Sequence, residues 1–328
     1  MIAYTRNKYG GPEVLKLDNT KIPALMSGQI RIKVVASSAN PADWRIIRGK
    51  PFFARFTFGL LQPKYPIPGV DFAGIVVSVG NQVSRFKVGD RVFGEVLLGG
   101  AFAEYINVDE SRCSHMPAKT DFIEMASVPL AGITALQALI NHGKLKRGET
   151  VLINGSTGGV GHIAVQIARA HGAHVTAVCS SKNTAFAFEL GADEVIAYDK
   201  ENIHYHDRKY DLVIDNHGNL TFDDLKRLGG RSVVVGFTSI RHMILLQLKK
   251  SFSKYPFKQF TAEANRQDLE ILAMLVESGR IVVHLDKVYP FSKVPEAIAY
   301  VEKMRTRGKV AIVFDKVSDL NSNAIKMS

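Results

Sequence analysis

The stretch from Glu149 to Gly172 constrains the fold of this chain more than any other part of its sequence. Val151–Ile153 is a short apolar run, which is typical of a parallel strand covered on both faces. A glycine-rich turn follows it. Beyond the turn, apolar residues recur on one side of a helix: Val160, Ile163, Ala164, Ile167 and Ala168. The sequence therefore predicts a strand, a turn and an amphipathic helix in immediate succession.

Such a turn suits a pyrophosphate, which must approach the backbone N–H groups at a helix N-terminus, where a Cβ atom would be in the way. The turn reads Ser156-x-Gly158-x-x-Gly161, with serine at the first position of the usual G-x-G-x-x-G pattern. The residues predicted to line a phosphate site are Ser156, Thr157, Gly158, Gly159, Val160 and Gly161. A turn without a ligand, in some other α/β sheet, is the alternative.

The residues after this helix favour the dinucleotide site. Further strand-like runs come at His174–Cys179, Glu194–Ala197, Tyr210–Asp215 and Arg231–Gly236, with helix-compatible stretches between them. Strands that alternate with helices in this way predict an α/β fold with a doubly wound parallel sheet.

Length and composition set the limits for the whole chain. Its 328 residues are 46% hydrophobic and 22% charged, as in a globular protein of about two domains. It begins without a basic segment and a long apolar core, so we expect no secretory signal. No apolar run approaches the ~20 residues of a membrane-spanning helix, and we expect no membrane partner. With only Cys113 and Cys179, the expected location is the reducing cytoplasm.

The formal net charge of +11 raises the question of a nucleic-acid partner. Lysine and arginine are scattered along the chain, with local pairs such as Lys249-Lys250 and no long basic block. The sequence contains no recognisable nucleic-acid-binding motif. We therefore expect a small-molecule partner, with solubility and a phosphorylated cofactor accounting for part of the excess charge.

Residues 1–122 show the pattern of short strands. Ile30, Ile32 and Val34 alternate with charged residues, as in a half-buried strand. From Pro66 to Gly94, and again from Gly100 to Val108, glycine and proline separate short apolar runs. This pattern predicts a small closed or partly closed β-barrel.

Several short motifs occur in a characteristic order: Asn40-Pro41-Ala42-Asp43-Trp44, Val88-Gly89-Asp90-Arg91-Val92, Ala131-Gly132-Ile133-Thr134-Ala135 and Gly308-Lys309-Val310. With the glycine turn, they make the chain resemble the medium-chain dehydrogenase/reductase superfamily, in its zinc-independent quinone oxidoreductase-like branch. The resemblance implies a GroES-like β-rich catalytic domain formed by residues 1–122 and 259–328, with a Rossmann domain inserted at residues 123–258. It also implies a homodimer, formed along an edge strand at Phe257–Thr261.

The zinc-dependent members of that superfamily carry a catalytic cysteine, a Gly-His-Glu motif and a later four-cysteine lobe. This chain has Ser37 and Ser38 before Asn40, and Gly69-Val70-Asp71 in place of Gly-His-Glu. Between Asp90 and Ala103 there is no cysteine. Because a catalytic zinc needs about three protein ligands of the His, Cys, Asp or Glu type, we expect no metal.

The end of the second predicted Rossmann strand bears on the choice of cofactor. NAD-dependent enzymes commonly have Asp or Glu about 20 residues beyond the glycine turn, bonded to the ribose 2′-hydroxyl. This chain has Ser180, Ser181 and Lys182 there, which can donate to a 2′-phosphate, so we predict NADP(H). By resemblance, Tyr198 contacts the same phosphate; alternatively it is a strand-end aromatic residue with its hydroxyl in water.

Other site residues are implied by resemblance. Thr134 and the backbone of Gly236-Phe237-Thr238 would lie near the nicotinamide; alternatively, Thr134 bonds only its own helix backbone. Asn216 is a candidate because it follows the predicted strand Tyr210–Asp215, at the carboxyl edge where open sheets bind ligands, although the family more often has Asp-x-Val-Gly-Gly there. Asn40 and Asp43 are the catalytic candidates, Asn40 as an amide at the acceptor or nicotinamide and Asp43 as a residue that orders this loop or a water. A capping or turn role for both is the alternative.

The predicted activity is hydride transfer from NADPH to a quinone or an α,β-unsaturated carbonyl compound. Delocalisation in such acceptors lowers the demand on an enzyme that has no Lewis-acid metal. Two other classes of function stay open: a non-catalytic NADPH-binding sensor or adaptor, and a nucleic-acid-binding protein.

The last part of the chain is predicted to contain a helix at Asp268–Gly279, a strand-like run at Ile281–Val283 and a final strand at Lys309–Phe314. Lys309 is interpreted as an exposed strand lysine, with a phosphate contact as the alternative.

Overall fold

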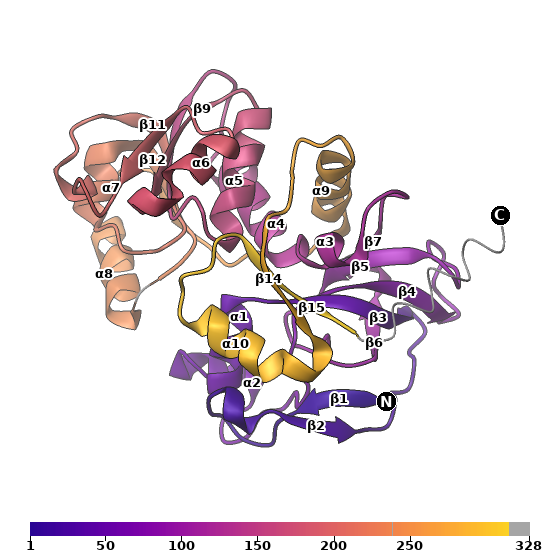
Figure 1. The fold of residues 1–328 in the computed structure, drawn as a ribbon. Coiled ribbons are helices and arrows are strands. Elements are labelled where there is room, and N and C mark those ends of the chain that lie inside the picture. Colours follow the sequence, from indigo (N-terminus) through magenta and orange to yellow (C-terminus); the bar gives the residue numbers. More distant parts are fainter. Residues whose placement is uncertain (238, 315–328) are drawn as a thin grey trace. The chain divides into compact units, whose positions relative to one another are not determined.

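Two sheets organise the chain, each within its own compact unit, in the computed structural model, which describes residues 1–237 and 239–314 (Figure 1). Unit 1 comprises Met1–Leu130, Ala264–Glu277 and the described residues from Leu285 onward. Unit 2 comprises Ala131–Glu263 and Ser278–His284. Thr238, predicted to bind the cofactor, lies outside the described residues.

Unit 2 is built on a six-stranded parallel sheet. Its strands are β8 (Thr150–Asn154), β9 (His174–Cys179), β10 (Glu194–Ala197), β11 (Tyr210–Asp215), β12 (Gly229–Val234) and β13 (Phe257–Gln259). In space they follow the order β10-β9-β8-β11-β12-β13. The direction of winding therefore reverses between β8 and β11, the switch point at which open α/β sheets bind ligands. The predicted doubly wound sheet is confirmed.

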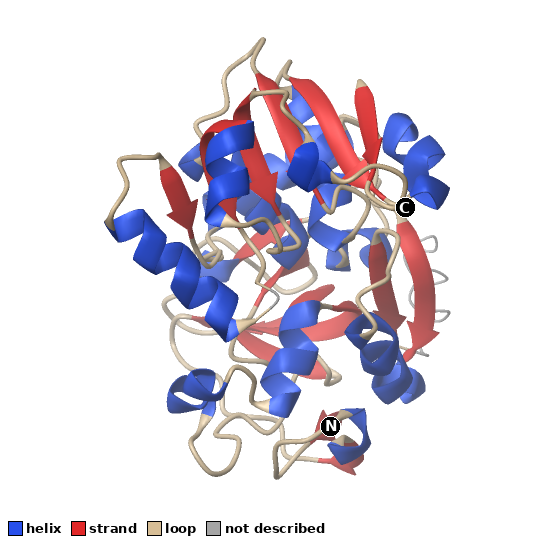
Figure 2. Cartoon of the chain, turned by 90° about the vertical axis from the view of Figure 1, so that its left-hand side faces the viewer, coloured by secondary structure: helices blue, strands red, loops and turns tan. Residues whose placement is uncertain are grey.

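Helices connect these strands and flank the sheet (Figure 2). They are α5 (Gly159–Ala170), α6 (Thr184–Glu189), α7 (Phe222–Leu228) and α8 (Ile240–Ser251), and α4 (Pro129–Leu136) leads into the unit. Leu152, Val178, Val213 and Leu225 are buried together in one apolar core cluster. The apolar side chains of the strands thus pack against the helices that flank the sheet, as the strand pattern predicted.

Unit 1 contains a mixed sheet in the order β14-β15-β3-β4-β5-β7, with β6 also paired to β3. Its strands are β3 (Gln29–Ala39), β4 (Asp71–Val79), β5 (Arg91–Glu95), β6 (Tyr105–Asp109), β7 (Cys113–His115), β14 (Leu285–Pro290) and β15 (Lys309–Val313). β15, from the end of the chain, pairs antiparallel with β3, from its beginning. This pairing brings strands from two distant parts of the sequence into one sheet.

Smaller elements complete unit 1: the antiparallel pair β1 (Ile2–Thr5) and β2 (Lys16–Asn19), with the helices α1 (Pro41–Arg48), α2 (Arg55–Phe58), α3 (Phe122–Ala126), α9 (Arg266–Glu277) and α10 (Val294–Glu302). Among the described residues, no helix is long and apolar enough to cross a bilayer.

The predicted strand at Ile281–Val283 is wrong. Ile281 and Val283 are buried and Val282 is exposed, which explains the strand-like pattern. The backbone of Val282, however, bonds to the side chain of Gln166 in α5: its N–H donates to Oε1 at 2.8 Å, and its carbonyl accepts from Nε2 at 3.0 Å. A side-chain amide therefore satisfies the backbone groups that a neighbouring strand would otherwise pair.

Candidate functional site

The glycine turn in unit 2 delivers the chain from β8 to the start of α5. Gly155 has a φ of +75°, a conformation that favours glycine. Gly158 is the N-cap of α5, and its position provides no side-chain hydrogen bond to the helix. The first N–H groups of an α-helix have no intrahelical partner, so this end of α5 presents donors and the positive end of the helix dipole.

Gly161 and Gly158, at the start of this helix, are glycines for different structural reasons. A Cβ at Gly161 would lie 2.0 Å from the carbonyl oxygen of Gly155, so only glycine lets α5 pack against the turn. A Cβ at Gly158 would meet nothing closer than 3.8 Å. The fold therefore requires Gly161, whereas Gly158 keeps open a space that the protein itself does not fill.

The side chains of Ser156 and Thr157 hold the turn rather than extend from it. Ser156 is fully buried, and its hydroxyl donates to the carbonyl of Val178 in β9 at 3.0 Å. The Thr157 hydroxyl accepts from the side-chain amide of Asn183 at 3.3 Å. An anion at this turn would consequently meet the backbone N–H groups of Gly159, Val160 and Gly161 rather than these hydroxyls.

The ends of β11 and β12 meet the turn at the switch point. The Cβ of Asn216 lies 3.7 Å from the position of a Cβ on Gly155, and the Asn216 carbonyl lies 2.4 Å from that of a Cβ on Gly236. Both the nitrogen and the oxygen of the Asn216 side-chain amide are shielded from water and lack a hydrogen-bond partner. A buried amide without partners, beside an open helix N-terminus, fits a site for a dinucleotide.

Two residues that the sequence analysis did not assign shape this edge. Asp215 is fully buried and accepts hydrogen bonds from the N–H groups of Gly218 and Leu220 and from the Asn154 amide, at 2.8, 3.0 and 2.8 Å. Burial raises the pKa of the Asp215 carboxyl, and these three donors oppose that rise. In the sequence, the only signal was a polar residue at the end of each of two neighbouring apolar strands.

The predicted 2′-phosphate residues lie at the carboxyl ends of β9 and β10, which pair in register from Glu194 with Thr176 to Ala197 with Cys179. Ser180 is nearly buried, whereas Lys182 and Tyr198 are exposed. The sequence analysis missed Asp199, which accepts from the Ser181 N–H at 2.7 Å and from its hydroxyl at 2.6 Å. These two hydrogen bonds lower the pKa of Asp199, so a carboxylate occupies the Ser181 donors.

For the remaining predicted cofactor residues, the structure gives their element and burial. Thr134 is nearly buried in α4, and Phe237 follows β12 in a partly buried position. The structure thus brings together the turn, Asn216 and Gly236, with the β9 end beside them.

Unit 1 contains a buried polar cluster that gathers the catalytic candidates. Sheet register explains it: Ser38 in β3 lies opposite Asp71 in β4, and Asp71 lies opposite Glu95 in β5. The carboxylate of Asp71 accepts from the Ser38 hydroxyl at 2.7 Å, the Asn40 amide at 2.9 Å and the Leu130 N–H at 2.9 Å. Asp71 is therefore the centre of this cluster.

The sequence analysis interpreted Lys309 as an exposed strand lysine, and this interpretation is wrong. Lys309 is 3% exposed, and its ammonium lies 3.3 Å from the Asp71 carboxylate and donates to the side-chain oxygen of Asn40. The pairing of β15 with β3 places this end of β15 beside Asn40. A buried charge needs such a partner, and a lone sequence cannot show which strand supplies it.

Asn40 and Asp43 are both buried and form a capping box at the start of α1. The Asn40 N–H donates to Asp43 Oδ2 at 2.7 Å, while the Asn40 amide is bonded to Asp71 and Lys309. The other Asp43 oxygen, Oδ1, is buried without a partner. Burial, followed by the nearby Asp71, raises the pKa of Asp43 to about 7.

Glu95 is the second carboxyl that the cluster leaves unpaired. It is 1% exposed, and neither of its oxygens has a hydrogen-bond partner. Burial and then the charge of Asp71 raise its pKa to about 8, against the opposing effects of Arg112 and Lys309. Among the described residues, no group of three or more His, Cys, Asp or Glu side chains is arranged to hold a metal ion.

Comparison with known proteins gives consistent matches along the chain. The alcohol dehydrogenase GroES-like domain family matches residues 26–118, and the zinc-binding dehydrogenase family matches residues 190–312. The chain is 34% identical to the chloroplast envelope quinone oxidoreductase homolog of Arabidopsis thaliana, over 95% of this chain and 98% of that protein.

A second Arabidopsis thaliana relative, the chloroplastic NADPH-dependent alkenal/one oxidoreductase, is 34% identical over 95% of this chain and 79% of its own length. Among solved structures, the quinone oxidoreductase from Coxiella burnetii matches with a TM-score of 0.85 at 30% identity. That match covers 95% of this chain and 99% of the other.

Proposed function

The chain belongs to the medium-chain dehydrogenase/reductase superfamily, in its quinone oxidoreductase-like branch, and from this we propose that it is an NADPH-dependent reductase. The proposed acceptor is a quinone or an α,β-unsaturated carbonyl compound. The observation that carries the proposal is the open start of α5 beside the unpartnered amide of Asn216. The names of the two relatives, one for quinones and one for alkenals and enones, support the acceptor class.

The residues of unit 2 would hold the coenzyme by its phosphates. The N–H groups of Gly159, Val160 and Gly161 would bind the pyrophosphate, and the space beside Gly158 would admit it. Asn216 would donate and accept through its amide at the carboxyl edge of the sheet. When bound, the nicotinamide supplies the hydride; the protein has to orient it and to keep competing water away.

The preference for the phosphorylated coenzyme is the finer part of the proposal. Lys182 is exposed and offers an ammonium group to a 2′-phosphate, which supports NADPH. Asp199 acts in the opposite direction, because its carboxylate occupies the Ser181 donors and would repel a phosphate. We therefore propose NADPH with a preference that Asp199 reduces.

Asn40 and Asp43 are proposed to position the loop at the start of α1. Every polar atom of the Asn40 side chain is engaged by Asp71, Ser38 or Lys309. Asp43 fixes the backbone of Asn40 through the capping box. Both residues would then act on the acceptor through the order they impose rather than through direct contact.

The test is an acceptor panel of quinones, alkenals, enones and simple ketones, run with NADPH and NADH side by side. We expect acceptor-dependent loss of nicotinamide absorbance with the quinones or enones. Saturable coenzyme binding without turnover would instead favour a non-catalytic coenzyme-binding protein. If the protein binds neither NADPH nor NADH, the whole proposal is wrong.

Location and assembly extend this proposal. The relatives' names place those proteins in chloroplasts, whereas we propose the cytoplasm for this chain, in agreement with its two unpaired buried cysteines. We also propose a homodimer that forms along β13, the edge strand of the parallel sheet. Light scattering of the purified protein tests the dimer.

A further inference from the structure

His217 carries the first exposed side chain beyond β11, and it lies beside the glycine turn. The strand ends at Asp215, Asn216 is partly buried and His217 is exposed. The Cβ atom of His217 lies 3.6 Å from the position that a Cβ on Gly155 would take. With the described residues the imidazole forms no hydrogen bond, so its ring nitrogens can bond to a ligand.

Gly155 links this side chain to the start of α5. Its carbonyl oxygen lies 2.0 Å from the position that a Cβ on Gly161 would take, so Gly155 packs directly against the first turn of α5. The Gly158 N–H donates to the same carbonyl at 3.4 Å. His217 therefore flanks the helix start at which the coenzyme phosphates are proposed to bind.

The order of the strands indicates which half of the coenzyme reaches His217. In the sheet, β9 and β11 lie on opposite sides of β8. The residues proposed for the 2′-phosphate, Ser180 to Lys182, follow β9, and the glycine turn follows β8. A dinucleotide with its adenosine half at the end of β9 and its diphosphate at the turn therefore extends its nicotinamide half toward the end of β11.

The backbone on both sides of His217 is held in place. The Asn216 N–H donates to the carbonyl of Asn154, the last residue of β8, at 3.1 Å. The Gly218 N–H donates to the buried carboxylate of Asp215 at 2.8 Å. The side chain of His217 is thus exposed on a fixed backbone, which is what a preorganised binding residue needs.

We propose that His217 binds the coenzyme phosphate that belongs to the nicotinamide half, through a hydrogen bond donated by its imidazole. A neutral imidazole has one N–H and a protonated one has two, so either form can donate to a phosphate oxygen. This inference rests on the proposed function and adds to it a residue that recognises one half of the coenzyme.

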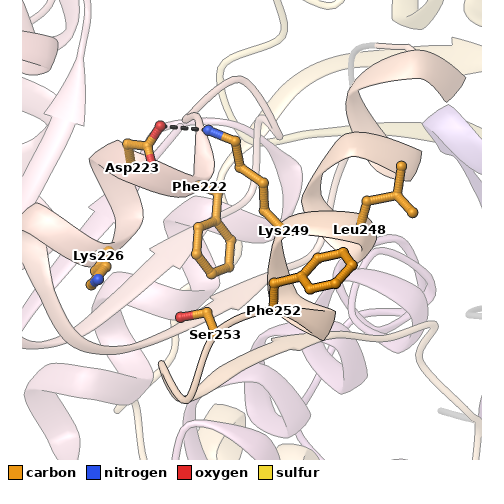
Figure 3. A pocket seen from close by; sticks show the side chains of 7 residues that line it. All are labelled: Phe222, Asp223, Lys226, Leu248, Lys249, Phe252 and Ser253. Carbon is orange, nitrogen blue, oxygen red and sulfur yellow. Dashed lines mark hydrogen bonds and ion pairs between the residues drawn. The ribbon is translucent and has the colours of Figure 1, made fainter.

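The hollow between α7 and α8 is another place in unit 2 where cationic side chains border a recess (Figure 3). Lys226 and Lys249 line this shallow hollow of about 350 Å³, but Lys249 is paired with Asp223, which lines it as well. A carboxylate in the lining repels phosphate, so the hollow does not suit a diphosphate. Its lysines serve instead as controls.

Calorimetric titration with NADPH and two of its fragments tests the proposal. Adenosine 2′,5′-bisphosphate has only the phosphates of the adenosine half, whereas 2′-phospho-ADP-ribose has the diphosphate and both riboses but no nicotinamide ring. His217→Ala should weaken NADPH and 2′-phospho-ADP-ribose by about tenfold or more, as for the loss of a hydrogen bond to a charged group. It should leave the affinity for adenosine 2′,5′-bisphosphate unchanged.

Conservative variants and controls separate a hydrogen bond from a general disturbance. His217→Asn and His217→Gln place an amide near the position of one or the other ring nitrogen, so one of them should recover most of the lost affinity. His171→Ala removes an exposed histidine at the C-terminal end of α5, and Lys226→Ala removes a cation of the hollow. Both controls should bind all three compounds as the wild type does, and all variants should unfold at the wild-type temperature.

Three results would overturn the assignment of His217. Undiminished NADPH binding in His217→Ala would show that the residue makes no contact. An equal loss for adenosine 2′,5′-bisphosphate would mean that the substitution disturbs the whole site, and a loss for NADPH alone would mean that His217 contacts the nicotinamide ring. A wild-type protein that binds neither NADPH nor NADH would instead contradict the proposed function. If NADH binds more tightly, the same comparison is made with NADH, ADP-ribose and AMP.

Discussion

At the scale of single residues, the most unusual feature is a pair of carboxyls directly opposite each other in a sheet. Asp71 and Glu95 are register partners in β4 and β5, and both are buried. Like charges in this position are unfavourable, and only Asp71 has the hydrogen bonds and the ammonium of Lys309 that stabilise a carboxylate. The fold therefore favours a proton on Glu95.

This leads to a prediction for the pH dependence of stability. Because the pKa of Glu95 is about 8 in the fold and near the ordinary 4.5 in the unfolded chain, the folded chain binds more protons between these values. The stabilising effect is complete below about pH 4.5 and is lost as the pH rises to about 8. Asp43 contributes in the same direction up to about pH 7.

Glu95→Gln removes the ionisable group. We therefore expect the free energy of unfolding of this variant, relative to that of the wild type, to increase as the pH rises from 5 to 8. The gain should be a few kcal/mol, since each pKa unit corresponds to about 1.4 kcal/mol. Urea unfolding at a series of pH values measures it. Glu277→Gln, at an exposed position at the end of α9, is the control, and a similar pH-dependent gain there would contradict the assignment.

Lys309 gives a second prediction at this scale. Lys309→Met would keep the buried stem and remove the ammonium, which would leave Asp71 without its counter-charge. Removing one partner of a buried ion pair costs about 3–5 kcal/mol. Denaturant unfolding at neutral pH should show a loss of this order. A loss far below this range would contradict the stabilising pairing of Lys309 with Asp71.

Asp199 carries the prediction for coenzyme choice. Asp199→Asn removes a negative charge beside the proposed 2′-phosphate site, and Asp199→Ala also frees the N–H and hydroxyl of Ser181. We expect the ratio of kcat/KM for NADPH over NADH to rise about fivefold in the first variant and further in the second, because a charge that repels the 2′-phosphate is removed. Asp207→Asn, at an exposed position of the same unit, should leave the ratio unchanged.

At the scale of elements, the β8–α5 connection separates what the fold needs from what a ligand needs. Gly161→Ala would place a Cβ 2.0 Å from the Gly155 carbonyl, so we expect a loss of stability of about 2 kcal/mol or more. Gly158→Ala meets nothing within 3.8 Å and should cost about 1 kcal/mol or less as a change of N-cap.

Calorimetric titration with NADPH tests the other half of this pair. Gly158→Ala should weaken coenzyme binding by at least about tenfold although it folds, because its methyl group would stand where the pyrophosphate approaches. Undiminished binding in a folded Gly158→Ala variant would show that the phosphates do not pass this glycine.

The elements also show how far sequence reasoning reaches. The parallel strands and the glycine turn were predictable, because buried apolar runs and the lack of a Cβ leave a local signal at Val151–Ile153 and Gly161. Asp199 and Lys309 were not, because their partners lie on other strands and depend on sheet order. The run at Ile281–Val283 has a strand's burial pattern, but its hydrogen-bond partner is the side chain of Gln166. The pattern of apolar residues in a sequence indicates which side chains are buried. Which backbone groups pair with each other depends on the order of strands in the assembled sheet.

At the scale of the molecule, each unit has an apolar core of its own, one around Ile32, Phe72 and Val310 and the other around Leu152, Val213 and Phe257. The proposed coenzyme residues all belong to unit 2, and the buried carboxyl cluster belongs to unit 1. A ligand that binds only the native form of one unit stabilises it by mass action. Coenzyme binding in unit 2 can therefore be tested by adding the coenzyme, and the protonation of the buried carboxyls in unit 1 can be tested separately by changing the pH.

Coenzyme-linked stability is the corresponding prediction. At about 100 times its dissociation constant, NADPH should add about 2.7 kcal/mol to the free energy of unfolding, which corresponds to a rise in Tm of about 5–10 °C for a unit of this size. Differential scanning calorimetry with and without NADPH measures the shift, and if two transitions are resolved only one should move. Gly158→Ala at the same NADPH concentration should show a clearly smaller shift, whereas Glu95→Gln should shift as the wild type does. An equal shift in Gly158→Ala would mean that the coenzyme binds somewhere other than the start of α5, because a methyl group there disturbs nothing else in the protein.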